Sequence, residues 1–363
     1  MATEVETSIP IHDNGGRPHD EFRSTGTELI AQLPAWAEPL VQASQKAGED
    51  AAAALRLAEE FGRMLPQPGG GDTAARWAVL AAVSRENLTV GRVLEAHSDA
   101  LAILGEAGQP APAGTWGVFA AEAAPHRLEA RERGGSVALY GVKPWCSLAA
   151  QLDAALITAH VGDDRQLFRV PLQHRSVTFE PPDGWVARGL RTVTSAAIHL
   201  DGTPAVPVGP PGWYLVRPGF AWGGMGVAAC WHGGATGLQA ALIARSAKRS
   251  GELSALHVGL VDAALHASES VLARAAAEID NGKAEGSAGA ELELRVRAVV
   301  ADAAERTLRQ VGHALGPAPL AFDEEHARRV ADLELYLRQH HAERDLARLG
   351  EVTLAGYRQE TGR

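Results

Sequence analysis

The stretch ALYGVKPWCS, residues Ala138–Ser147, stands among short β-type runs in the middle of a 363-residue chain. Gly, Pro and Asp separate these runs, which is the punctuation typical of strands joined by turns. The runs are Ser136–Tyr140, Ala154–Val161, Gln166–Pro171, Ser176–Phe179 and Thr192–Leu200. This pattern predicts a β domain over residues 111–212.

The sequence on both sides of this region has helical periodicity. Residues 22–110 contain Ala-rich segments interrupted by prolines, which predicts an N-terminal helical domain. Residues 213–355 return to a period near 3.6, with one loose connection at Asn281–Gly289, which predicts a C-terminal helical bundle. Residues 1–21 and 356–363 are expected to be tails. The predicted fold class is therefore α+β and multi-domain, in the order helices, strands, helices.

Composition excludes several classes of function. The chain has 34 Lys and Arg against 44 Asp and Glu, a net charge of −10, and no basic block, so nucleic acid is not an expected partner. No apolar run reaches the ~18 residues that a membrane-spanning helix needs, and no signal peptide is recognised. The two cysteines, Cys146 and Cys230, form no disulfide framework. We expect a cytoplasmic protein that neither enters nor crosses a membrane.

Three short sequence motifs, in this order along the chain, resemble the motifs of one protein family. ALYGVKPWCS is similar to a Gly-x-Lys-x-Trp-[Ile/Cys]-[Thr/Ser] signature, RQVGHALG (Arg309–Gly316) to a Gln-x-x-Gly-Gly-x-Gly segment, and RQHHAERDLARLG (Arg338–Gly350) to a closing Arg-Asp helix. All three belong to the acyl-CoA dehydrogenase superfamily, which the chain resembles over residues 22–355 as a divergent member. The resemblance implies the domain order given above. It also implies an FAD-dependent oxidoreductase that dehydrogenates an acyl thioester, carried by CoA or a carrier protein, between Cα and Cβ.

The first of these words implies residues that hold the flavin ring. By the resemblance, Trp145 packs beside the ring and the Ser147 hydroxyl lies near flavin N5, with Cys146 between them on the same strand. Lys143 and Gly141 also stand at the family positions. The alternative is that Trp145 is a buried core aromatic at the end of a strand.

The remaining cofactor contacts are eroded. Gln310 and Gly316 stand where the family approaches the adenosine end of FAD from a neighbouring subunit, but His313 and Ala314 replace the paired glycines. The alternative for this segment is a helix end capped by glycine. For the pyrophosphate, RSAKRSGEL (Arg245–Leu253) offers Arg249 as the candidate, with Arg245 and Lys248 as possible substitutes, and a solvated surface charge is the alternative. Of the family's Thr-Glu-Pro…Gly-Ser-Asp run, only a vestige around Glu122 is present.

The resemblance implies a catalytic glutamate either in a loop after the closing helix or on an earlier helix of the bundle. By resemblance it is Glu351, which a helix ending at Leu349–Gly350 would leave at the start of a loop. The alternative is a solvated glutamate in a fraying C-terminus.

Other chemistries lack their motifs. The sequence contains no HExxH, so His340 and His341 do not predict a metal site, and no metal is expected. HGGATG (His232–Gly237) lacks the context of a phosphate loop and more simply permits tight packing. No GxSxG nucleophile word occurs.

Two alternatives to dehydrogenation stay open. One is a binding or scaffold protein that has kept the fold and lost the cofactor, and the other is a flavin-dependent monooxygenase or oxidase. The long C-terminal helices and the resemblance together predict a homodimer or homotetramer. A separate electron acceptor is expected for the dehydrogenase.

Overall fold

The computed structural model describes residues 29–248 and 251–361. The predicted tail at 1–21 and the candidate Arg249 lie outside these ranges. The described part begins with short 3-10 turns at Leu29–Gln32 and Ala35–Ala37, followed by four helices: α1 (Glu38–Lys46), α2 (Ala51–Phe61), α3 (Thr73–Glu86) and α4 (Leu88–Glu106). Asn87 caps α4 by accepting a hydrogen bond from the amide of Val90, which fixes where that helix starts.

Seven strands follow and form one sheet. They are β1 (Trp116–Phe119), β2 (Leu128–Arg133), β3 (Ser136–Ser147), β4 (Ala154–Val161), β5 (Asp164–Pro171), β6 (Val177–Phe179) and β7 (Ser195–Val208). The order is β1-β4-β2-β3-β7-β5, with β6 beside β7, and a further pairing of β4 with β5 closes the sheet on itself. Closure leaves fewer unpaired strand edges.

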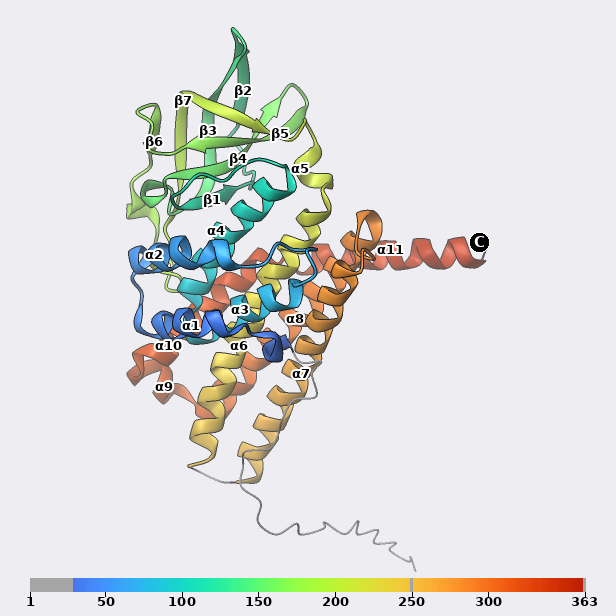
Figure 1. The fold of residues 1–363 in the computed structure, drawn as a ribbon. Helices are drawn as coiled ribbons and strands as arrows, with labels where there is room; N and C mark the ends of the chain where they lie inside the picture. The colour runs from blue at the N-terminus through green and yellow to red at the C-terminus, as the bar shows by residue number, and fades with distance from the viewer. Residues whose placement is uncertain (1–28, 249–250, 362–363) are drawn as a thin grey trace, which may run out of the picture.

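The remaining described helices, which include the longest ones, come last: α5 (Trp213–Val216), α6 (Pro218–Ser246), α7 (Glu252–Asp280), α8 (Gly286–Leu315), α9 (Pro317–Phe322), α10 (Glu324–Tyr336) and α11 (Glu343–Thr361). The α6 helix packs against α3, α7 and α8, and the strands gather at one end of the molecule (Figure 1). At Gly233 a side-chain Cβ would lie 2.2 Å from the Ala81 carbonyl oxygen, so the HGGATG word serves close packing of α6 on α3, as predicted.

The predicted fold class is confirmed, but the end of the chain differs from the prediction. The expected helix end at Leu349–Gly350 is wrong, because α11 runs on to Thr361 through the residues expected to form a tail. A glycine inside a helix costs only about 1 kcal/mol, which helix-forming neighbours can offset. Most of α11 extends away from the other helices (Figure 1). Among the described helices, none is long and apolar enough to cross a membrane.

Candidate active site

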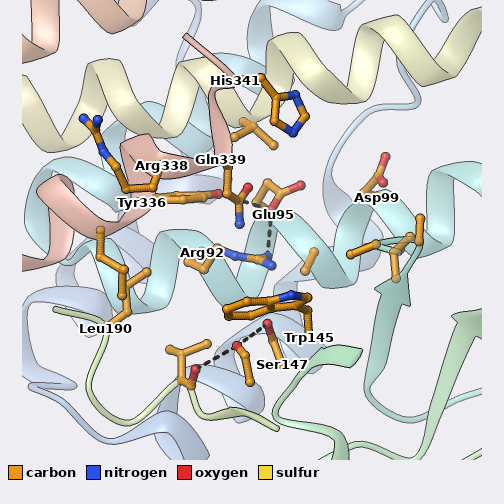
Figure 2. A pocket seen from close by; sticks show the side chains of 18 of the residues that line it. Arg92, Glu95, Asp99, Trp145, Ser147, Leu190, Tyr336, Arg338, Gln339 and His341 are labelled. Atoms are coloured by element: carbon orange, nitrogen blue, oxygen red, sulfur yellow. Dashed lines mark hydrogen bonds and ion pairs between the residues drawn. The ribbon is translucent and has the colours of Figure 1, made fainter. Parts of the chain in front are cut away.

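A cavity of about 620 Å³ lies where the strands meet the helices. This volume falls in the range of ligand pockets in proteins, about 300–1,000 Å³. One wall comes from the strands and the loop that precedes β7, with Trp145, Ser147, Trp185 and Ser195. The facing wall comes from α4 and the end of α10, with Arg92, Glu95, Asp99 and Tyr336. We call these the β wall and the α4 wall (Figure 2).

Trp145 projects into the cavity because the strand is interrupted beside it. The pairing of β3 with β7 shifts register between Lys143 and Cys146, and Trp145 takes a left-handed backbone conformation with φ of +59°. Its side chain is 58% exposed. The alternative of a buried core aromatic is therefore wrong, since more than half of the Trp145 side chain is exposed. Its left-handed backbone conformation is also unusual for a residue in a regular strand.

The residues after Trp145 alternate between cavity and interior. The Ser147 hydroxyl lies 2.8 Å from the Ser195 hydroxyl, which donates to the Val193 carbonyl oxygen at 3.2 Å. Cys146 points the other way and is buried, with its sulfur 3.3 Å from the Lys143 carbonyl oxygen. Burial raises the pKa of the Cys146 thiol. The Cys146 side chain therefore does not line the cavity, and its role in cofactor binding stays a prediction.

Trp185 adds a donor to the β wall that sequence reasoning missed. Its indole Nε1 is buried and has no hydrogen-bond partner within the described ranges. A buried indole N–H usually finds a partner, so an acceptor on a bound molecule would satisfy it.

The α4 wall is charged although it is largely buried. The Arg92 guanidinium donates to Glu95 Oε2 at 3.0 Å, and the Tyr336 hydroxyl donates to the same oxygen at 3.2 Å. Burial raises the pKa of Glu95, which the nearby Arg92 opposes, and burial also raises the pKa of Asp99. Clusters of perturbed carboxyl groups in a cavity are characteristic of functional sites.

The charged residues of the α4 wall have a recognisable spacing in the sequence. Arg92, Glu95 and Asp99 stand at positions i, i+3 and i+7 of a helix that is otherwise mainly apolar, so they share one face. On a surface helix, charged side chains at this spacing would face the solvent. On a helix buried between the sheet and α6 it instead places charge inside the protein.

A residue of the matching motif and the vestige of a degenerate motif meet next to the cavity. Lys143 Nζ donates to Glu122 Oε1 at 2.6 Å and to the carbonyl oxygen of Thr158 at 2.9 Å. Lys143 is 1% exposed, whereas Glu122 lines the cavity. Gly141 is required near this point because a Cβ there would lie 2.2 Å from the Arg127 carbonyl oxygen, at φ of +121°.

Other expected site residues lie elsewhere. Gln310 is on α8, 2.8 Å from His257 Nδ1, and Gly316 ends that helix with φ of +66°, which fits the capping alternative. Neither residue lines the cavity. Glu351 is exposed within α11 and does not line the cavity either, because the helix continues where a loop was expected. In the described ranges no three His, Cys, Asp or Glu side chains are grouped as metal ligands would be.

Comparison with known proteins reveals relatives by structure alone. No protein-family model matches the sequence, and neither does any curated protein. TdsC from Paenibacillus sp. A11-2, solved with FMN and indole, is 15% identical with a TM-score of 0.73, covering 88% of this chain and 96% of its own. KijD3, solved with FMN and dTDP-3-amino-2,3,6-trideoxy-4-keto-3-methyl-D-glucose, is 17% identical with a TM-score of 0.73, covering 90% and 93%.

Butyryl-CoA dehydrogenase from Megasphaera elsdenii is 15% identical with a TM-score of 0.71, covering 89% of this chain and 99% of its own. These likenesses extend over almost the whole of each chain. The chain therefore has the acyl-CoA dehydrogenase fold, as the three sequence words predicted.

Proposed function

We propose that this chain is a flavin-dependent oxidoreductase that holds the flavin ring against the β wall. The observation that carries the proposal is Trp145, a large apolar side chain more than half exposed at a strained backbone position inside a cavity. Strained conformations persist where function requires them, and an exposed indole is a suitable wall for a flat aromatic ring.

The β wall also offers polar groups suited to the edge of such a ring. A flavin edge carries acceptors, which the unpartnered Trp185 N–H could satisfy, and the hydroxyls of Ser147 and Ser195 lie beside Trp145 along the wall. When bound, the flavin would supply hydride acceptance or oxygen chemistry. The residues of the chain would orient the ring and leave the α4 wall free for a substrate.

The proposed ligand of the β wall is the flavin ring, which FMN and FAD share. The FAD predicted by resemblance remains a prediction, since Gln310 contacts His257 and does not line the cavity. The phosphate role of Arg249 stays a prediction as well. TdsC and KijD3, which share the fold, were solved with FMN.

The reaction type has two candidates. Dehydrogenation of an acyl thioester needs a base beside the flavin, and the carboxylates that line the cavity are Glu95, Asp99 and Glu122 rather than Glu351. A monooxygenase or oxidase needs no base of that kind. The position of Glu351 favours this second candidate, and a dibenzothiophene monooxygenase is among the proteins of similar structure.

We further propose that the chain assembles as a homodimer or homotetramer. Apolar side chains are exposed along α7 and α11, among them Leu253 at 72%, Leu354 at 56% and Tyr357 at 60%. Exposed apolar patches of this kind commonly mark protein interfaces. Light scattering at micromolar concentration is expected to give a multiple of 38.2 kDa, and a monomer mass would contradict the proposal.

The test of the flavin proposal is reconstitution with FMN and with FAD, followed by absorbance spectroscopy and quenching of tryptophan fluorescence. Trp145→Phe is expected to weaken flavin binding about 10-fold, a loss of about 1.4 kcal/mol. Trp36→Phe, a half-buried tryptophan outside the cavity, serves as the matched control. Absence of bound flavin from the wild-type protein at excess FMN and FAD would favour the scaffold alternative.

Two further measurements on the flavin-loaded protein separate the reactions. Bleaching of the flavin by octanoyl-CoA without oxygen is the outcome expected of an acyl thioester dehydrogenase. Rapid oxygen consumption after chemical reduction of the flavin, with no bleaching by octanoyl-CoA, is the outcome expected of a monooxygenase or oxidase.

A further inference from the structure

We infer that the α4 wall binds a protonated amine and that Asp99 is the carboxylate that receives it. The inference rests on the proposed function, because it takes the flavin to lie on the β wall and the substrate on the facing wall. It concerns binding and names the chemical class of the substrate.

Three carboxylates line the cavity, and two of them are already paired. Glu122 is bound by the buried Lys143, and Glu95 is bound by Arg92 and Tyr336. Asp99 has neither a cation within 4.0 Å nor a hydrogen-bond donor to its carboxylate within residues 29–248 and 251–361. It is therefore the carboxylate of this cavity whose charge a ligand could neutralise by direct contact.

The arginines nearest to Asp99 are occupied elsewhere. Arg217 pairs with Glu106 at 2.6 Å, and Arg76 donates to the Ser98 hydroxyl at 3.0 Å and to the Pro66 carbonyl oxygen at 3.1 Å. They moderate the potential at Asp99 without contacting it. A partly buried carboxylate in this situation lacks the pairing that buried charges normally require.

Asp99 also stands where a ligand can reach it. Its side chain is half-buried, and it lines both the main cavity and a neighbouring cavity of about 310 Å³. An ammonium group carries three donors and one positive charge, so it would match the unclaimed oxygens of Asp99 in both respects. A hydroxyl would match only the hydrogen bonds.

The aromatic lining supports the same class of ligand. Aromatic residues make up only 5% of the chain, yet four of them line this one cavity: Trp145, Trp185, Tyr214 and Tyr336. Trp145 and Trp185 belong to the β wall, beneath the proposed flavin. The Tyr214 and Tyr336 rings have arginine guanidinium groups 5.2 Å and 5.6 Å from their centroids, so they offer a substrate an apolar surface rather than a free site for a cation. An apolar aromatic surface beside one unpaired carboxylate suits an amine that carries a carbon skeleton.

A simple acyl chain is a poor match for this wall. Methylene groups placed against Asp99 and Glu95 would remove water from these charged groups and return no hydrogen bond, which is costly. The α4 wall therefore favours a charged substrate over an unsubstituted acyl chain.

The test compares amines with their neutral counterparts by isothermal titration calorimetry at pH 7.5. The pairs are 2-phenylethylamine with 2-phenylethanol, and cyclohexylamine with cyclohexanol, each titrated into flavin-free and FMN-loaded protein. We expect at least one amine to bind 10-fold or more tightly than its alcohol. Asp99→Asn is expected to remove this preference, whereas Glu95→Gln should reduce it less because Arg92 already neutralises Glu95. Asp302→Asn, on the exposed side of α8, is the matched control.

The outcomes separate this inference from the proposed function. If FMN fails to bind but the flavin-free protein still prefers amines through Asp99, the proposed function falls and the amine site stands. If FMN binds but neither amine exceeds its alcohol in the wild-type protein, the amine site is overturned alone. A preference that survives in folded Asp99→Asn would overturn it as well. The wild-type comparison decides the case even if Asp99→Asn does not fold.

Discussion

Lys143 Nζ lies 2.6 Å from Glu122 Oε1, so a residue of the matching motif is bound to the vestige of the degenerate one. Lys143 comes from the middle of β3 and Glu122 from the segment that follows β1. The ammonium is buried and also donates to Thr158. The pair thus fixes the segment carrying Glu122 against the strand that presents Trp145 to the cavity.

Glu122→Gln should therefore destabilise the protein. A buried ammonium would lose its anionic partner, although glutamine can still accept a hydrogen bond and the site is one-third exposed, so we expect about 1–3 kcal/mol. Urea denaturation would measure the change in the free energy of unfolding. Glu132→Gln, an exposed carboxylate on β2, should stay within about 0.5 kcal/mol. Equal effects of the two substitutions would show that the Lys143 pair contributes little.

Trp145→Gly should separate stability from flavin binding. Glycine accepts the positive φ of this position without the 1–2 kcal/mol that an L side chain pays, and the exposed indole makes fewer contacts than a core residue. The free energy of unfolding is expected to change by less than about 1 kcal/mol while FMN affinity falls at least 10-fold. Trp231→Ala, at a fully buried site on α6, should by contrast lose about 3–5 kcal/mol. A large loss of stability in Trp145→Gly would make Trp145 a structural residue instead.

The sequence predicted the larger features of the fold because they follow from local patterns. The order helices, strands, helices comes from hydrophobic periodicity, and the word around Trp145 identified the fold. The strand β7, Ser195–Val208, extends beyond the predicted run Thr192–Leu200, and the added residues include Pro204 and Pro207. They are tolerated within this strand by the tertiary pairing of the sheet, which no local pattern contains.

The site was predicted only in part, for a similar reason. Trp145 and Ser147 were found through their motif, whereas Trp185 and Asp99 matter only because folding brings them to one cavity from distant segments. Glu351 was expected at the start of a loop because the glycine before it suggested a helix end. Whether a helix stops at a glycine depends on the residues that follow, and here they continue the helix.

Glu351→Gln should accordingly have no effect on the site. The side chain is exposed on α11, and substitutions at such positions usually change stability by less than about 0.5 kcal/mol. FMN affinity and the flavin absorbance maximum are expected to match the wild type. A changed flavin spectrum in this variant would bring Glu351 back into contact with the cofactor, for instance across an interface between subunits.

The raised pKa of Glu293 on α8 should make the stability of the protein depend on pH. Burial raises its pKa to about 7 from a usual value of 4.5, against the opposing effect of Arg297 3.9 Å away. Asp345 and Arg348 of α11 also act on it, the first raising and the second lowering the pKa.

The sign of the effect follows from proton binding. Between pH 4.5 and 7 the folded protein keeps a proton that the unfolded chain has released, so the free energy of unfolding falls as pH rises, by on the order of 3 kcal/mol from this group. Glu293→Gln should remove that fall. Urea denaturation at pH 5 and pH 8 is expected to show equal stability of the two proteins at pH 5 and a more stable variant at pH 8. A variant less stable at both values would contradict this assignment.

The Arg92–Glu95 pair allows a test of what the α4 wall is for. Burying an ion pair costs desolvation that the attraction of the two charges does not always recover, so replacing both by apolar residues of similar volume is often neutral or stabilising.

Arg92→Met alone would leave Glu95 buried without its cation and should cost about 3–5 kcal/mol. Arg92→Met combined with Glu95→Met should recover most of that loss. If the pair is kept for a polar ligand, the double variant should be folded and as stable as the wild type, yet bind 2-phenylethylamine more weakly, by a smaller factor than Asp99→Asn. A double variant as unstable as Arg92→Met would mean that the pair is needed for the fold itself, and unchanged amine binding would mean that the ligand does not use this part of the wall.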